Sequence, residues 1–394
     1  MEKEIVKSDS HETMTGHPDG SGMESLDSLR CRIDEIDLGI IKLLAERQAE
    51  VDHMVSLKKA HNLPVHHPAR EENMISERRS LGINMGLDPD YLEELFRGIM
   101  RRSRVDQTES ISRKGIRTGS TVLIVGGTRG MGRYFYNWFK KSGYETRSMG
   151  SKDWGRIESL CRDIDLAIIS VPIDSTESVI YKIAPYLPPH CVLADLTSIK
   201  SLPLKAMLEA HKGPVVGLHP LFGPNTSSMD KQIIVTTPGR GSEACKWLNE
   251  QLAAWGAVVV QADSKEHDDA MSVVQALRHF ATFAFGRFLF RRKVDLLRTL
   301  EFSSPIYRLE FGMVGRLFAQ DPALYSEIIF ASPERRALLK DYLASMTESI
   351  AMVEKGDKEE FNRQFHQIAE WFGPFSEQAM RESTFLIEKL IERF

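Results

Sequence analysis

The sequence predicts a multidomain protein in which an all-α segment, an α/β domain and a second all-α segment follow one another. Three observations support this order. Apolar residues recur at helical spacing in the first hundred residues, short β-branched runs alternate with helices from residue 121, and strand patterns end near residue 266. At 394 residues the chain has room for two or three domains.

The N-terminal part is predicted to be helical after a disordered start. Residues 1–22 are polar and lack the apolar residues that a packed core needs. From Ser25 to about Ala60 the apolar residues fall at helical spacing without a proline, which predicts one long helix that the HNLPVHHP segment ends. Three segments follow: a helix over 69–79, a helix over 89–106 and a polar linker over 107–119.

The middle of the chain is predicted to form a mostly parallel sheet with helices on both faces, as in Rossmann-like folds, because apolar runs alternate with helical segments. The predicted strands are TVLIV (121–125), LAIISVP (166–172), CVLADL (191–196), PVVGLHP (214–220), KQIIVTT (231–237) and AVVVQA (257–262). Residues 267–394 are rich in Phe, Leu and Met at helical spacing, and we expect them to pair two subunits. The predicted divisions are 1–22, 23–106, 107–119, 120–264 and 265–394.

Composition and charge narrow the class of protein. The formal net charge is −4, so no basic field indicates nucleic-acid binding. No apolar run reaches 18 residues and no apolar segment resembles a secretory signal, so we expect a cytoplasmic protein without a membrane span. The cysteines are far apart and are expected to be free thiols in a reducing compartment: Cys31, Cys161, Cys191 and Cys245.

A glycine-rich turn follows the first predicted strand and precedes a helix. In this context backbone N–H groups and a helix N-terminus can hold a pyrophosphate, although such turns also occur without a ligand. The spacing is G-x-x-G-x-G, with Arg129 where the usual fingerprint has its second glycine. Gly150 stands where an acidic residue would bind the ribose of NAD, and Asp153 comes slightly later. We predict NAD as the first choice, and NADP stays open because Arg129, Arg147 and Lys152 are near.

Polar residues follow several predicted strands at their carboxyl ends, where ligands bind in open parallel sheets. Ser198 and Lys200 follow one strand, and His219 ends another. Histidine suits a general base near neutral pH, whereas a lone histidine after a strand is more often structural. The presence of His219, Ser198 and a glycine turn in one predicted sheet favours a catalytic site.

The N-terminal helices resemble the all-helical chorismate mutase family over LRCRIDEIDLGIIKLLAERQAEVDHMVSLKKAHNLPVHHPAREENMI. The resemblance implies an intertwined dimer, in which the first-helix arginine serves the partner's site. Arginines would grip the substrate carboxylates, Lys58 and Gln107 would donate to the breaking ether oxygen, and Glu71 would bind the hydroxyl. The chain has His67 where some relatives carry an acid. The implied substrate-binding residues are Arg30, Arg47, Lys58, Arg70, Glu71, Ser103 and Gln107.

The remainder resembles prephenate dehydrogenase in DLTSIK, AHKGPVVGLHPLFGP, EHDDAMSVVQALRHFATFAFG and SSPIYRLEFGMVGRLFAQDP. Residues 24–375 together therefore resemble bifunctional chorismate mutase–prephenate dehydrogenases of tyrosine biosynthesis. The resemblance implies that His219 is the base, that Ser198 orients it and that Arg316 binds a prephenate carboxylate. Gln275 and His279 would line the substrate site, and Lys200 would either line it or have a structural or secondary role. The implied cofactor contacts are Gly126, Gly127, Thr128, Arg129, Gly130, Met131, Gly132, Val171, Pro172 and His211.

Two other functions remain open from the sequence. A hydroxy-acid dehydrogenase could use the same architecture, but it would not need the mutase helices. A regulatory protein could keep the folds without the chemistry, but the motif residues named above are intact. No metal is expected, the resemblance suggests tyrosine as a feedback inhibitor, and a homodimer is expected.

Overall fold

The computed structural model describes residues 25–61, 68–111 and 115–391. The chain divides into two compact units, Met1–Asn62 and Leu63–Phe394, and each is described by itself. Among the described residues no helix is both long and apolar enough to span a bilayer.

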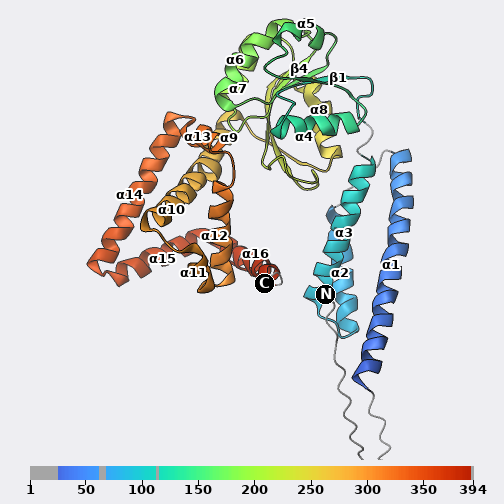
Figure 1. Cartoon of the computed structure of the whole chain (residues 1–394), viewed down its shortest axis with the longest axis vertical. Coiled ribbons are helices and arrows are strands. Elements are labelled where there is room, and N and C mark those ends of the chain that lie inside the picture. Colours follow the sequence, from blue (N-terminus) through green and yellow to red (C-terminus); the bar gives the residue numbers. More distant parts are fainter. Residues whose placement is uncertain (1–24, 62–67, 112–114, 392–394) are drawn as a thin grey trace, which may run out of the picture. The chain divides into compact units, whose positions relative to one another are not determined.

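The first unit is represented by a single long helix, α1 (Leu26–His61), as the sequence predicts (Figure 1). No proline interrupts it, and its apolar side chains repeat every three to four residues. Several of them are more than half exposed, including Ile33 at 56% and Ile36 at 62%. A helix with such a face needs another surface to cover it.

The second unit begins with a helical hairpin of α2 (Pro68–Asn84) and α3 (Pro89–Ile111). The turn between them contains Gly86 in the left-handed region (φ +75°). Arg79 ties the helices together by ion pairs with Asp90 and Glu93, both at 2.6 Å. Helix α3 continues past its predicted end near Asp106, so Gln107 lies in the helix.

The described residues after the hairpin form a seven-stranded sheet in the order β2-β1-β3-β4-β5-β6-β7. The mostly parallel sheet is confirmed, but β6 runs antiparallel to β5, which pairs His219 with Val235. The strands are β1 (Thr121–Val125), β2 (Glu145–Met149), β3 (Leu166–Ile169), β4 (Val192–Asp195), β5 (Val215–Pro220), β6 (Ile233–Arg240) and β7 (Val258–Gln261).

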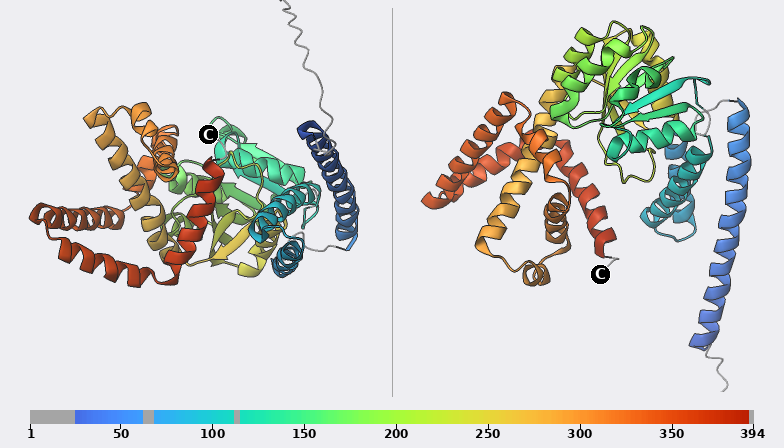
Figure 2. Two further views of the ribbon diagram at one scale, coloured as in Figure 1. Left: turned by 90° about the horizontal axis from the view of Figure 1, so that it is seen from below. Right: turned by 45° about the horizontal axis from the view of Figure 1, so that its top comes forward.

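Helices cover both faces of this sheet (Figure 2). Alternate strand residues point to opposite faces, so Ile124 and Ile168 pack under α4 and α8, whereas Leu123 and Ile169 pack under α5, α6 and α7. All four are fully buried, and each such side chain contributes about 1.5–3 kcal/mol. The helices are α4 (Gly130–Lys141), α5 (Ile157–Leu160), α6 (Ile173–Ile183), α7 (Ser201–Ala210) and α8 (Ser242–Ala254).

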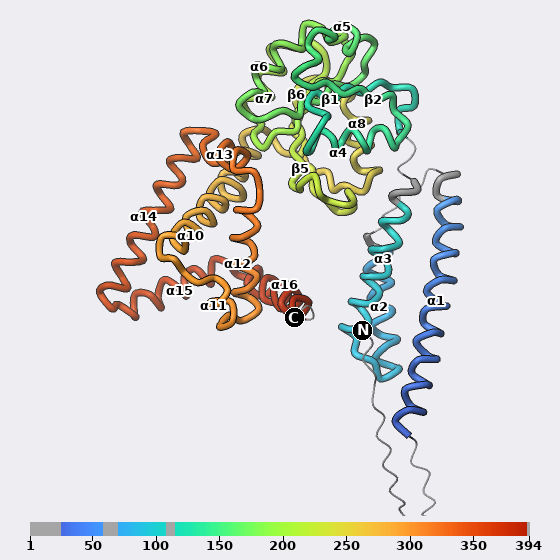
Figure 3. The backbone as a smooth tube through the Cα atoms, viewed as in Figure 1, coloured from blue at the N-terminus to red at the C-terminus, as the bar shows by residue number. Residues whose placement is uncertain are grey.

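The described residues after β7, up to 391, are helical, as predicted, and α9 leads from the sheet into this helical part (Figure 3). Large apolar side chains remain exposed here, such as Phe290 and Trp371, both at 81%. The elements are α9 (Ser264–Met271), a π-helical turn (Ser272–Leu277), α10 (Arg278–Arg292), α11 (Leu296–Glu301), α12 (Pro305–Phe318), α13 (Pro322–Phe330), α14 (Pro333–Lys355), α15 (Lys358–Phe372) and α16 (Pro374–Ile391).

Candidate functional site

The glycine turn lies at the carboxyl end of β1. Gly126 has φ +87°, and a Cβ at this position would lie 2.0 Å from the Ser170 carbonyl oxygen. A Cβ on Gly132 would lie 2.4 Å from the Gly126 carbonyl oxygen. The backbone therefore comes this close to β3 and α4 only with glycine. Val171, which follows β3, lies beside the same turn.

An acidic side chain does stand near the end of β2, although Gly150 occupies the expected position. The Gly150 N–H donates to Asp153 Oδ2 at 2.8 Å, which holds that carboxylate at the strand end. Arg147 does not face this site, because its Nη1 donates to the Arg162 carbonyl oxygen at 2.6 Å and its Nε to Glu145 at 2.9 Å. One of the cations that favoured NADP is thus engaged elsewhere.

His219 lies at the end of β5 and is 2% exposed. Its Nδ1 is 2.8 Å from His267 Nε2, and His267 Nδ1 is 2.8 Å from Asp268 Oδ1. The Asp268 carboxylate also accepts the backbone N–H groups of Lys200 at 2.7 Å and Ser201 at 2.9 Å. His267 and Asp268 come from α9, so the first helix after the sheet is placed against the strand that carries His219.

This hydrogen-bonded chain determines which ring nitrogen of each imidazole donates and which accepts. Burial opposes the charge on Asp268, but hydrogen bonds from His267 and Ser201 outweigh it and lower the pKa of Asp268. The ionised carboxylate makes His267 Nδ1 a donor, so His267 Nε2 accepts from His219 Nδ1. His219 Nε2 is left as an acceptor, and the Gln275 amide Nε2 lies 3.3 Å from it. His219 is therefore arranged to accept a proton at Nε2.

The environment keeps this base neutral. Burial lowers the pKa of His219 well below its ordinary value, and the nearby charge of Lys200 acts in the same direction. A base that stays unprotonated near neutral pH can take a proton from a substrate hydroxyl.

Two residues predicted to act with His219 have different surroundings. No described hydrogen bond joins Ser198 to His219, and the neighbour that orients the imidazole is His267. Lys200 is fully buried, where it pairs with Asp195 and donates to the Leu218 carbonyl oxygen at 2.8 Å. These contacts favour the structural role, which the sequence leaves open for Lys200 beside a role in substrate binding.

His211 was expected beside the cofactor, and the structure contradicts this. Its Nε2 is 2.7 Å from the carbonyl oxygen of Cys191, the residue before β4. It therefore lies at the amino end of β4, whereas Ser198 and the glycine turn lie at the carboxyl ends. A strand separates His211 from any ligand bound at the glycine turn.

Residues of the helical part line the other side of the His219 site. Gln275, in the π-helical turn, reaches His219, and His279 lies one turn later on α10. The His279 ring packs edge-on against Tyr325 of α13, with centroids 4.8 Å apart. Burial raises the pKa of Tyr325, and the charge of Arg316 on α12 opposes this rise. Of the predicted residues, His279 therefore contacts Tyr325, Arg316 acts on the same phenol through its charge, and Gln275 contacts His219.

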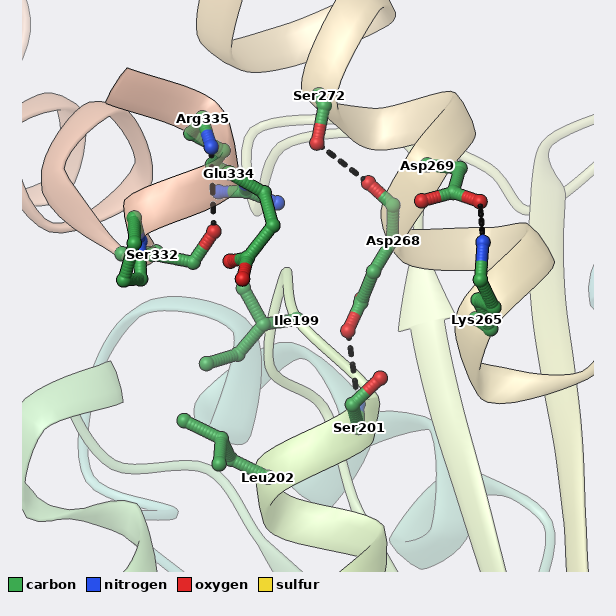
Figure 4. Close-up of a pocket in the computed structure, with 12 residues that line it drawn as sticks. Ile199, Ser201, Leu202, Lys265, Asp268, Asp269, Ser272, Ser332, Glu334 and Arg335 are labelled. Carbon is green, nitrogen blue, oxygen red and sulfur yellow. Dashed lines mark hydrogen bonds and ion pairs between the residues drawn. The ribbon is translucent and has the colours of Figure 1, made fainter. Parts of the chain in front are cut away.

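A cavity lined by Asp268 lies between α7, α9 and the start of α14 (Figure 4). Ser201 and Asp268, which are hydrogen bonded to each other, form one wall, and Arg335 belongs to the opposite wall. Arg335 is 2% exposed and its Nη1 donates to the Ile328 carbonyl oxygen at 2.5 Å. Its charge also opposes protonation of His219, as a weaker influence than burial or Lys200, and so helps to lower the pKa of that histidine.

The predicted mutase residues fall on both units. Arg30 and Arg47 lie on α1, where Arg30 pairs with Asp27 at 3.2 Å, and Lys58 lies on the same helix. His67 lies outside the described residues.

The α2–α3 hairpin carries the other predicted mutase residues. Arg70 is exposed, whereas Ser103 and Gln107 are each 5% exposed. Glu71 Oε2 accepts from Arg104 Nη1 at 2.6 Å. The hairpin therefore brings Glu71 and Arg104 together and buries the α3 face that carries Ser103 and Gln107.

Comparisons with known proteins identify the family of the chain. Residues 29–108 match the family chorismate mutase type II, and residues 141–261 and 263–367 match the nucleotide-binding and dimerization domains of prephenate dehydrogenase. The T-protein of Enterobacter agglomerans is 43% identical over 92% of this chain and 97% of its own length. The T-protein of Haemophilus influenzae is 40% identical over 94% and 98%. The chain belongs to the T-protein family.

As a member of this family, the chain is a bifunctional enzyme of tyrosine biosynthesis, with a chorismate mutase followed by a prephenate dehydrogenase. The fold has a solved counterpart in the prephenate dehydrogenase of A. aeolicus in complex with hydroxyphenyl propionate and NAD+. Its TM-score is 0.53 at 19% identity, covering 64% of this chain and 97% of that one. This likeness supports the architecture of the dehydrogenase part.

Sequence reasoning missed four residues of these sites: Arg104, His267, Asp268 and Tyr325. His267 and Asp268 lie in the EHDDAM segment that resembles prephenate dehydrogenase, but the resemblance alone gives their side chains no role. The partners of Arg104 lie on α2 and in the loop between β5 and β6, and the partner of Tyr325 lies on α10. A single sequence contains no signal that pairs them.

Proposed function

We propose that His219 is the general base of the dehydrogenase and that Nε2 takes the proton. The chain of hydrogen bonds from His219 through His267 to Asp268 carries this proposal, because it leaves Nε2 as an acceptor. The C4 hydroxyl of prephenate would give its proton to Nε2 as the hydrogen on C4 leaves as hydride. Carbon dioxide then departs, and the ring aromatises to give 4-hydroxyphenylpyruvate.

Other side chains would hold the substrate for this step. Arg316 is exposed on α12 and would bind a prephenate carboxylate through two parallel N–H···O hydrogen bonds, that is, in a bidentate manner. Gln275 and His279 line the approach to His219, and Ser198 remains a predicted member of the site. Gln275 must move aside when the substrate hydroxyl reaches Nε2, because its amide covers that atom.

We propose NAD as the preferred cofactor. The glycine positions that admit no Cβ support a closely bound pyrophosphate, and Asp153 supplies an acid near the end of β2 for the ribose. The nicotinamide cofactor, when bound, supplies the hydride acceptor. NADP remains the alternative, and kcat/KM measured with both cofactors decides between them: a strong preference for NADP would contradict the proposal.

For the mutase we propose electrostatic catalysis without a covalent intermediate. Arg30, Arg47 and Arg70 would bind the carboxylates of chorismate, which holds its reactive conformer. Lys58 and Gln107 would donate to the breaking ether oxygen, and Glu71 would bind the hydroxyl. We further propose a cytoplasmic homodimer, in which Arg30 serves the partner's site, and feedback inhibition by tyrosine.

The test of the dehydrogenase proposal is His219→Asn in the full-length enzyme. General-base catalysis contributes roughly 10²- to 10⁴-fold, so kcat with prephenate and NAD should fall by about that factor. Chorismate mutase turnover serves as the internal control and should stay within twofold of wild type. Equal loss of both activities would remove the assigned role.

A further inference from the structure

Arg104 is a buried arginine shared between the mutase helices and the dehydrogenase domain. It is 7% exposed and lies on α3, next to Ser103. Its Nη1 donates to Glu71 Oε2 at 2.6 Å, and its Nε donates to Asp230 Oδ2 at 3.2 Å. The side chains of Glu71 and Asp230 are only 15% and 8% exposed, so solvent screens these contacts weakly.

Asp230 is held in place by the dehydrogenase core. It lies in the 221–232 loop that joins β5 to β6, and the neighbouring Met229 is fully buried among the apolar residues of the sheet. The backbone N–H of Asp230 donates to Ser228 Oγ at 3.0 Å, and the N–H of Lys231 donates to the Gly256 carbonyl oxygen at 2.9 Å. This loop directly follows β5 and starts two residues after His219. Asp230 is therefore held by the segment that immediately follows the strand carrying the base.

The charge of the same loop also acts on α2. The pKa of Glu72 is lowered, chiefly by its hydrogen bond from Arg97, and the charge of Lys231 adds to this effect. Lys231 adjoins Asp230, and Glu72 adjoins Glu71. Glu71 is therefore joined to Asp230 through Arg104, and the adjacent Glu72 is affected by the charge of Lys231.

We infer that Arg104 is a positioning residue that couples the two catalytic domains, because it orients the Glu71 carboxylate of the mutase from an anchor on the dehydrogenase loop. The inference rests on the proposed role of Glu71 in binding the chorismate hydroxyl. With both carboxylates present, the guanidinium divides its donors between them. Without Asp230, Arg104 turns fully to Glu71 and competes with the substrate hydroxyl for the Glu71 oxygens.

The direct test is Asp230→Asn in the full-length chain, assayed for chorismate mutase activity. Asparagine keeps the size of the side chain and removes its charge, while Glu71 still compensates Arg104. We expect the KM for chorismate to rise roughly three- to tenfold, as for coupling between contacting residues, with kcat within twofold. Asp230→Glu should restore the KM to within twofold of wild type. A general loss of structure would instead lower kcat and the melting temperature in both variants, which would contradict the inference.

Matched variants make the result specific. Asp90→Asn removes a carboxylate that pairs with Arg79 at 2.6 Å on the same hairpin, and it should leave the KM for chorismate unchanged. Arg104→Gln combined with Asp230→Asn should raise the KM no further than Arg104→Gln alone, because both act through one contact. An unchanged KM in Asp230→Asn, or additive effects in the double variant, would overturn the coupling. Glu71→Gln distinguishes the proposed role of Glu71 from the coupling through Arg104. If Glu71→Gln leaves the KM for chorismate unchanged, Glu71 does not bind the substrate. If Glu71→Gln raises that KM but Asp230→Asn does not, the coupling alone is overturned.

Discussion

Replacing His267 by glutamine tests whether the base depends on its hydrogen-bonded chain. His267 Nε2 is the acceptor, 2.8 Å away, that makes His219 Nδ1 a donor. Glutamine is uncharged and polar, but it has no second ring nitrogen on its opposite side. It therefore cannot contact His219 and Asp268 at the same time, as His267 does. The His267→Gln variant therefore loses the group that holds the Nε2 lone pair of His219 toward the substrate.

The expected magnitude follows from the burial of both imidazoles, each 2% exposed. A glutamine amide can replace only one of the two hydrogen bonds of His267, and a buried polar group that loses its partner costs about 1–3 kcal/mol. Since 1.36 kcal/mol corresponds to tenfold in rate, kcat should fall roughly 5- to 150-fold. The KM for prephenate should stay within threefold, because His267 acts through His219.

The assay is steady-state formation of NADH from prephenate by the full-length variant, with mutase turnover measured in parallel. His190→Gln is the matched control, because it makes the same change at an exposed histidine of the same domain. We expect His190→Gln to match wild type in both activities. A His267→Gln variant with kcat within twofold of wild type, or with its whole loss in KM, would refute the reasoning.

Four further predictions concern single groups. Arg316→Ala should raise the KM for prephenate about 10- to 100-fold with a smaller change in kcat, as expected for a lost charge-assisted hydrogen bond; an unchanged KM in initial-rate measurements would exclude the clamp. Asp153→Ala should weaken NAD about tenfold and shift the kcat/KM ratio toward NADP, and a constant ratio would place the ribose elsewhere. Lys200→Met should lower the free energy of unfolding by about 3–5 kcal/mol in denaturant titrations, because it leaves Asp195 buried and unpaired; an unaltered midpoint would contradict this. The lowered pKa of His219 means that the unfolded chain binds the extra proton, so stability should fall as the pH drops below about 6.5, and thermal melts of His219→Asn should show a shallower fall.

The sequence predicted the elements with strong local signals. β-branched runs such as TVLIV became buried strands, and the absence of proline between Ser25 and Ala60 gave the single helix α1. The glycine turn was predictable because a tight strand-to-helix connection needs residues without a Cβ. The long apolar helices after residue 266 followed from their periodicity.

The features that the sequence did not predict depend on spatial relations that periodicity does not encode. An apolar strand pattern is the same in both directions, so the antiparallel pairing of β6 was not predictable. His211 lies in a matched motif but caps the amino end of β4, and only the strand direction reveals that. His267 is 48 residues from His219, and the π-helical turn after α9 helps to bring Gln275 to the same imidazole.

The central claim is that two separate sets of residues catalyse successive reactions in this chain. The most direct measurement supplies chorismate and NAD to full-length His219→Asn and Lys58→Ala variants and follows prephenate, 4-hydroxyphenylpyruvate and NADH. We predict that His219→Asn accumulates prephenate without NADH, and that Lys58→Ala consumes no chorismate but oxidises added prephenate at the wild-type rate. Loss of both activities in either variant would contradict the account.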